Sequence, residues 1–134
     1  MRDLKIFSAE KHKERRLDEP AVRINIPIGT FTFNMTATEI LDLQAGDMVN
    51  LGFDERMNDW FVYKVKEGGF VLRVIGKERG RGLIFNNATT AQAVAKSIKF
   101  RGKSFLVRIG SEPEVEAETK THYWSLITAA VENE

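Results

Sequence analysis

The sequence contains no cysteine, which excludes disulfides, thiolate metal ligands and a cysteine nucleophile, and which fits the reducing cytoplasm. No run of about eighteen apolar residues occurs, so we expect no membrane-spanning helix. Residues 1–20 mix basic and acidic side chains without an apolar stretch, so we do not expect a secretory signal there. With 134 residues, 43% of them hydrophobic, the chain can bury a core as one domain.

Net charge is also nearly absent, at +1, but this total hides an asymmetry along the chain. Residues 21–59 carry 2 basic and 6 acidic side chains, and residues 111–134 carry 1 and 6. Residues 60–110, between them, carry 11 basic and 2 acidic side chains, a net charge of +9. Such a basic middle indicates either a polyanionic partner or acidic stretches that fold back against it.

Histidine is scarce, and its scarcity limits the chemistry that the chain can perform. His12 and His122 are the only two, far apart in sequence, and no serine belongs to a recognisable catalytic signature with a histidine and a carboxylate. The glutamates between 112 and 118 lack the glycine turn and the ligand order of a calcium loop. We therefore predict no catalytic residue, no metal site and no cofactor, and we expect that the protein is not an enzyme.

Two segments of the sequence resemble each other. Phe31-Thr32-Phe33-Asn34 is matched by Leu83-Ile84-Phe85-Asn86, and a capping-box pattern follows each, at 36–39 and at 89–92. These patterns predict two short amphipathic helices. Their expected buried faces are Ala37, Ile40 and Leu41 in the first helix, and Ala91, Val94, Ala95 and Ile98 in the second.

Alternating apolar residues predict strands on both sides of each helix. The order is β-β-α-β-β over residues 21–67 and again over 68–130, after a charged N-terminal arm at 1–20. Each half is expected to have a glycine turn after its helix, and an acidic, solvated and mobile loop is expected at 110–121. We therefore predict a mainly β fold with two short helices, in which two repeats form one pseudo-twofold barrel within a single domain at 21–134. The predicted strands are 22–26, 31–34, 49–53, 60–63, 70–74, 83–86, 105–109 and 123–126.

The first half resembles the AbrB/MazE swapped-hairpin family. The residues that carry the resemblance are Gly29, Phe31, Phe33, Ile40-Leu41-Asp42-Leu43, Gly46-Asp47, Val49, Leu51, Phe53 and Asp54. The resemblance covers residues 22–65, and it extends to 70–128 only through the internal repeat. The chain departs from the family at Asn34, where the family usually has proline, and in lacking a basic arm between its first two strands. The related double-psi barrel is an alternative.

The resemblance implies DNA binding, as in transcription regulators and antitoxins, and the family's basic contacts correspond to the Gly-rich segment 76–82. Its cations are Lys77, Arg79 and Arg81, which suit phosphates and guanine edges, although a hydrophilic turn would have the same composition. A second basic set is Lys96, Lys99, Arg101 and Lys103, which a helix C-terminus also favours. Arg23 and Arg73 occupy matching places in the opening strands of the two halves.

Two functions remain open from the sequence. The first is a DNA-binding regulator or antitoxin-like protein that uses the basic hairpin loop. The second, which a double-psi barrel would imply, is a non-catalytic structural or adaptor protein of a mobile element or virion, with a protein partner. In either case we expect no membrane partner, and either a monomeric pseudo-dimer or a homodimer.

Overall fold

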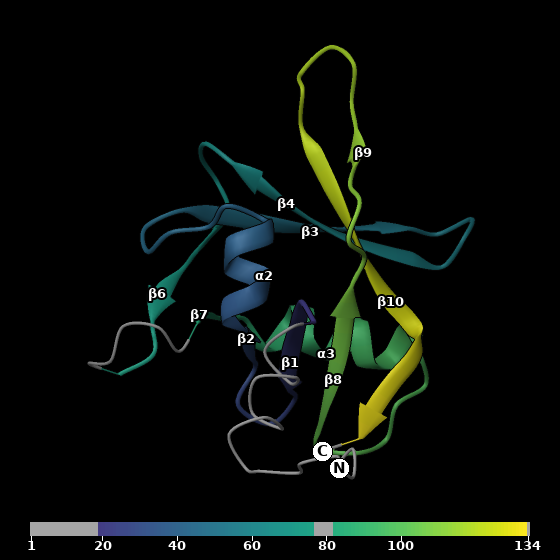
Figure 1. The fold of residues 1–134 in the computed structure, drawn as a ribbon. Helices are drawn as coiled ribbons and strands as arrows, with labels where there is room; N and C mark the ends of the chain where they lie inside the picture. The colour runs from purple at the N-terminus through teal and green to yellow at the C-terminus, as the bar shows by residue number, and fades with distance from the viewer. Residues whose placement is uncertain (1–18, 77–81, 134) are drawn as a thin grey trace, which may run out of the picture.

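The structure, a computed structural model, describes residues 19–76 and 82–133. Strands dominate it, as the mainly β prediction requires (Figure 1). The described part has two helices, α2 (Met35–Ile40) and α3 (Ala88–Ser97), and neither is long and apolar enough to cross a membrane. The strands are β1 (Ala21–Asn25), β2 (Thr30–Phe33), β3 (Met48–Asp54), β4 (Asp59–Val65), β5 (Phe70–Val71), β6 (Arg73–Val74), β7 (Leu83–Asn86), β8 (Ser104–Ile109), β9 (Glu114–Val115) and β10 (His122–Asn133).

The strands form a nearly closed antiparallel β barrel. Their order is β5-β3-β4-β10-β8-β1-β2-β7-β6, with β9 paired to β10 outside this path. The two ends of the order, β5 and β6, are separated in sequence only by Leu72. Leu72 is buried, and its backbone bonds to Gly46 and Asp47 at 2.8 Å each. One short segment therefore pairs with β3 on one side and with β7 on the other, which brings the sheet round on itself.

The core is built from the inward-facing side chains that strand alternation predicted. Phe31 and Phe85 lie on the paired strands β2 and β7, and their rings stack at a centroid distance of 4.6 Å. Phe70 stacks on the other face of Phe85 at 4.7 Å, which links the closing segment to the centre of the barrel. Such aromatic pairs add stability beyond the area that they bury. The other large side chains that are almost fully buried are Phe33, Phe105, Ile24 and Leu72.

Each helix begins two residues earlier than the capping boxes predicted. The N-cap residues are Asn34 and Asn87, whose side-chain oxygens accept the amides of Ala37 and Thr90 at 2.8 and 2.9 Å. Thr36 and Thr89, the expected caps, lie inside the helices. Asparagine takes this role because its short side chain reaches the third amide of the first turn.

Both helices end in the same way. Asp42 and Lys99 adopt positive φ angles of 54° and 58° just after the helix, and the next residue donates its amide back across the last turn. These bonds join Leu43 to Thr38 and Phe100 to Ala95, at 2.8 and 2.9 Å. This Schellman arrangement satisfies carbonyls that the helix leaves free, with a non-glycine residue where glycine is usual.

Three local expectations differ from the structure. Ile40 was expected on the buried face, but its side chain is 37% exposed because α2 ends there. Phe53 was expected on one strand face with Val49 and Leu51, but it lies near the end of β3, is 39% exposed and packs against Trp60 at a centroid distance of 4.7 Å. The segment 110–121, expected to be a loop, contains β9, which pairs with the start of β10 to form a hairpin that projects from the barrel (Figure 1).

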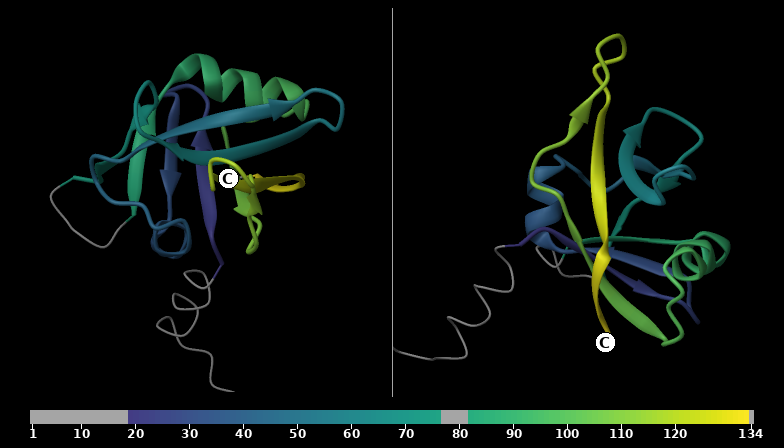
Figure 2. Two further views of the ribbon diagram at one scale, coloured as in Figure 1. Left: turned by 90° about the horizontal axis from the view of Figure 1, so that it is seen from above. Right: turned by 90° about the vertical axis from the view of Figure 1, so that its right-hand side faces the viewer.

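The strand pairings of the two halves correspond. The pair β1–β2 matches β6–β7, the pair β3–β4 matches β8–β10, and β1–β8 matches β5–β3. Two further pairs, β2–β7 and β4–β10, join one half to the other. The helices α2 and α3 lie on opposite sides of the barrel, as the right-hand view of Figure 2 shows.

Candidate functional site

The loop that was predicted to contact DNA lies outside the described residues. Lys77, Arg79 and Arg81 all fall between 76 and 82, where the chain passes from β6 to β7. The predicted N-terminal arm at 1–20 likewise falls outside, except for its last two residues.

Arg23 and Arg73 both face outward, at opposite ends of one row across the barrel wall. Arg23 pairs with Thr32, Thr32 with Ile84, and Ile84 with Arg73. The path from Arg23 to Arg73 crosses three strand-to-strand spacings, which separates the two backbone positions by about 14 Å. Arg73 donates a hydrogen bond from Nη2 to the side-chain oxygen of Asn86. The two arginines therefore share a face of the sheet, with a hydroxyl and an aliphatic side chain between them.

The second basic set gathers at the connection from α3 to β8. Lys96, Lys99, Arg101 and Lys103, which we call the basic turn, are all exposed. Phe100 lies between two of them, and its ring packs on Phe105 at a centroid distance of 4.6 Å. This anchor and the Schellman end of α3 hold the backbone of the turn, so the cations project from a fixed support.

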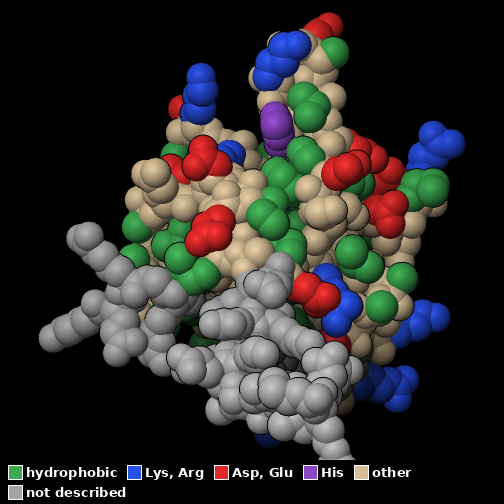
Figure 3. All heavy atoms as spheres, viewed as in Figure 1, with side chains coloured by type: hydrophobic (Ala, Val, Ile, Leu, Met, Phe, Trp, Pro, Cys, Tyr) green, Lys and Arg blue, Asp and Glu red, His purple; other side chains and the backbone are tan. Residues whose placement is uncertain are grey.

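Few acidic groups oppose the basic turn. The sequence has no Asp or Glu from residue 88 to residue 111, and no ion pair joins the basic turn to any other described residue. Arg108, further along β8, differs because it pairs with Glu19 and Glu132 at 3.1 Å each. In Figure 3, blue side chains gather at the lower right, the side on which the α3–β8 connection runs in Figure 1.

Arg23 lies on the strand next to the basic turn. Its strand β1 pairs with β8, and the amide of Ile26 donates to the Lys103 carbonyl at 2.8 Å. Arg73 lies on the same outer face but three strands away from Arg23, on β6. The structure thus brings four of the five described candidates, Arg23, Lys99, Arg101 and Lys103, to two neighbouring strands and the turn that enters them.

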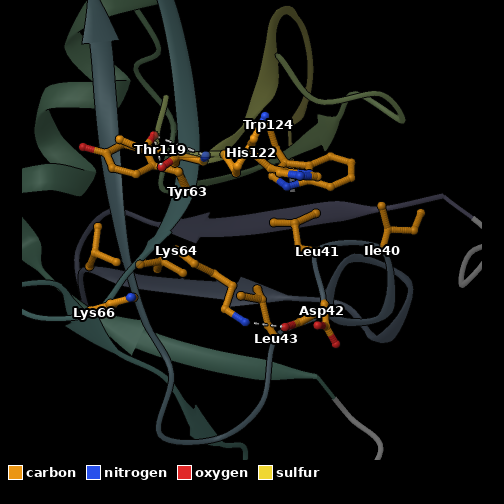
Figure 4. A pocket seen from close by; sticks show the side chains of 14 residues that line it. Ile40, Leu41, Asp42, Leu43, Tyr63, Lys64, Lys66, Thr119, His122 and Trp124 are labelled. Atoms are coloured by element: carbon orange, nitrogen blue, oxygen red, sulfur yellow. Dashed lines mark hydrogen bonds between the residues drawn. The ribbon is translucent and has the colours of Figure 1, made fainter. Parts of the chain in front are cut away.

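A cleft of about 480 Å³ lies elsewhere, and sequence reasoning did not find it. It opens between the end of α2, the strand β4 and the β9–β10 hairpin (Figure 4). Trp124 and His122 project from β10 toward Leu41 and Ile40 across the opening. Little in the sequence indicates this cleft, because its walls come from three segments that only the barrel brings together. The lining residues at its rim and floor include Leu43, Val49, Tyr63, Lys64, Lys66 and Lys120.

One lysine of the cleft is fixed by hydrogen bonds. The Nζ of Lys64 donates to the carbonyl of Asp42 at 2.9 Å and lies 3.4 Å from Oδ2 of Asp47. The Asp42 carbonyl belongs to the C-terminal end of α2, where the helix leaves partial negative charge. Lys64 therefore neutralises the helix end that would otherwise repel an anion.

The hairpin above the cleft has an electrostatic contact of its own. The Tyr123 hydroxyl donates to Oε2 of Glu116 at 3.4 Å, and the Tyr123 ring packs on Tyr63 at a centroid distance of 4.7 Å. Partial desolvation, together with the negative charge of Glu116, raises the pKa of Tyr123 above its ordinary value of 10.0.

No group of three or more His, Cys, Asp or Glu side chains able to hold a metal ion occurs within residues 19–76 and 82–133. Comparison with known protein families, curated proteins and solved structures found no significant match to this chain.

Proposed function

We propose that this protein is a non-catalytic DNA-binding barrel whose contact surface includes the basic turn. The observation that carries the proposal is the exposure of Lys96, Lys99, Arg101 and Lys103 on one anchored connection, in a stretch of sequence that has no carboxylate. Cations that neutralise phosphates release condensed counterions, which supplies sequence-independent affinity. A fixed backbone lowers the entropy that the contact costs.

Neighbouring groups on the barrel wall suit the same partner. Arg23 adds a cation beside the turn, and the outward side chains of Asn25, Thr30 and Thr32 offer amide and hydroxyl donors of the kind that contact phosphate oxygens. We include the Gly-rich loop with Lys77, Arg79 and Arg81 in the proposed surface, because the resemblance to swapped-hairpin proteins implies a DNA contact at that connection. We also include Arg73 in this part of the proposed surface, because its strand β6 directly precedes the loop in the sequence.

We also propose that the barrel arose by duplication of one β-β-α-β-β unit of the swapped-hairpin type. The double-psi barrel is the alternative. Three features support duplication: the matching strand pairings, the Asn caps and the Schellman ends. A fourth is the pair Gly29 and Gly82, which have φ angles of 77° and 99°. Each glycine lies close to the chain where the other half's helix begins. Gly29 approaches Ala88, the first residue of α3, and Gly82 approaches Phe33 and Asn34, which directly precede α2.

Fluorescence anisotropy with a mixed duplex pool, at about 50 and about 200 mM salt, tests the DNA-binding proposal. A protein that contacts several phosphates should lose affinity by orders of magnitude across this range. The double variant Arg101→Ala/Lys103→Ala should bind more weakly and lower the slope of log K against log salt by about 2.

The matched control is Lys66→Ala/Lys120→Ala, which removes the same charge from the exposed rim of the cleft and should leave DNA binding unchanged. The triple variant Lys77→Ala/Arg79→Ala/Arg81→Ala measures how much the Gly-rich loop contributes to the affinity for DNA. Equal affinity of the parent and of both basic-surface variants would contradict the proposal.

A structural or adaptor role is the second candidate, and the β9–β10 hairpin favours it. The hairpin projects from the barrel and carries exposed carboxylates at Glu112, Glu114, Glu116 and Glu118 (Figure 1). A protruding acidic hairpin suits charge-complementary contact with a basic protein surface. A pulldown from native lysate should then return a protein partner that Glu→Gln substitution of these four residues releases, with no salt-dependent DNA affinity.

A further inference from the structure

We propose that the cleft between α2 and the β9–β10 hairpin binds a small anion that carries a planar aromatic group. This site is separate from the basic turn and does not rest on the DNA-binding proposal. Its volume of about 480 Å³ falls in the range of small-molecule pockets, which are about 300–1,000 Å³, and barrel mouths are common places for them.

The floor of the cleft is apolar and rigid. Leu41, Leu43, Val49 and Trp124 line it, and each is at most 9% exposed because its other side belongs to the barrel core. Ile40 stands at the rim, where its exposed side chain faces Trp124 across the opening (Figure 4). A flat ring between an indole and aliphatic side chains would remove apolar surface of the ligand and of Ile40 from water.

The rim of the cleft is basic. Among the lining residues Lys64, Lys66 and Lys120 are cationic and Asp42 alone is acidic, which leaves a net charge of +2. Lys64 is occupied by the backbone carbonyl of Asp42 and the carboxylate of Asp47, whereas Lys66 and Lys120 form no ion pair with any other described residue. These two ammonium groups are therefore available to a ligand's carboxylate or sulfonate, and His122 adds an imidazole to the lining.

The wall opposite α2 is held in place. Tyr123 packs on Tyr63 of β4, and Thr119 bonds Glu116 and Thr121 at 2.9 and 2.8 Å, which fixes the turn that bears Lys120. His122 and Trp124 are two residues apart on β10, so both face the same side of the strand. The tyrosine pair and the backbone that bears Lys120 are thus set before a ligand arrives, which lowers the cost of binding.

Titration of the ¹⁵N-labelled full chain with 2-naphthoate, followed by amide chemical shifts, tests the proposal. We expect saturable shifts confined to residues 40–43, 63–66 and 119–124. The uncharged analogue 2-naphthalenemethanol should bind at least about tenfold more weakly, because it cannot use the lysines. The variant Lys66→Ala/Lys120→Ala should weaken naphthoate binding by about tenfold or more.

The variant Arg101→Ala/Lys103→Ala carries the same change in net charge and should bind 2-naphthoate as the parent does. The two double variants therefore serve as each other's controls in the DNA and naphthoate experiments, so failure of one proposal is distinguishable from failure of the other. Equal affinity for the acid and the alcohol, shifts centred outside the cleft, or no saturable shift at millimolar ligand would each overturn the proposed site.

Discussion

At the scale of single residues, a few positions have backbone conformations or close contacts that only one type of residue can accommodate. Gly82 shows this best, because it combines a φ angle of 99° with close approach to the Phe33 backbone. A Cβ atom at Gly82 would overlap the Phe33 carbonyl oxygen. Gly46 has a similar φ angle, 95°, but nothing lies within 4 Å of the position that its Cβ would take.

We therefore expect Gly82→Ala to destabilise the fold more than Gly46→Ala does. The Gly46 variant should lose about 1 kcal/mol from backbone strain alone, whereas Gly82→Ala adds a steric overlap that the paired strands cannot easily relieve. Urea unfolding of both variants measures the difference. Equal losses would mean that the approach of Gly82 to Phe33 does not constrain the fold.

Tyr123 gives a prediction about pH. Because its folded-state pKa is raised, the neutral phenol is favoured by folding. That stabilisation is present at neutral pH and is lost as the pH rises above 10.0 through the folded-state value. In the variant Tyr63→Phe, Tyr123 is the only tyrosine left, so ultraviolet titration reports its ionisation alone.

We expect the ultraviolet midpoint of this single-tyrosine variant above 10.0, and a lower midpoint when Glu116→Gln is added, because the substitution removes the nearby negative charge. A midpoint that Glu116→Gln leaves unchanged would show that the carboxylate does not act on the hydroxyl.

At the scale of elements, alternation along the longer strands predicted the buried faces well, since the barrel buries one side of each of them. The helix starts were predicted less well, because the Thr-x-x-Glu and Thr-x-x-Gln patterns competed with asparagines that cap each helix two residues earlier. Asn34 does more than cap α2. Its oxygen also accepts the Ala21 amide at 3.2 Å, and its amide donates to the Glu19 carbonyl at 2.7 Å.

The two caps should therefore differ in their effect on stability. We expect Asn87→Ala to cost about 1 kcal/mol, as an ordinary N-cap does, and Asn34→Ala to cost more, because it also removes the side-chain bonds to the Ala21 amide and the Glu19 carbonyl. Thr36→Ala should change the free energy of unfolding by less than either. If Thr36→Ala is the most destabilising of the three in urea unfolding, the capping box predicted from sequence is the correct cap.

At the scale of the whole molecule, the two ends of the sheet meet within one chain. The segment 70–74 pairs with β3 through β5 and with β7 through β6, so barrel closure does not call for strands from a second chain. Light scattering should therefore give the mass of a monomer, 15.2 kDa, at micromolar concentration. An obligate dimer that dissociates only on unfolding would instead mean that the halves exchange between chains.

Apart from β9 and the break at Leu72 that divides residues 70–74 into β5 and β6, the sequence by itself determined the secondary structure of this protein: the strand and helix order, the buried strand faces and the basic connection after the second helix. These follow from periodicity and composition, which act over a few neighbouring residues. Only the tertiary structure decided that Leu72 joins the two ends of the sheet, that Arg108 is neutralised by Glu19 and Glu132, and that Leu41, Lys66 and Trp124 surround one cleft. Such features depend on pairing between segments far apart in the chain, and pairing between distant strands leaves no fixed spacing in the sequence.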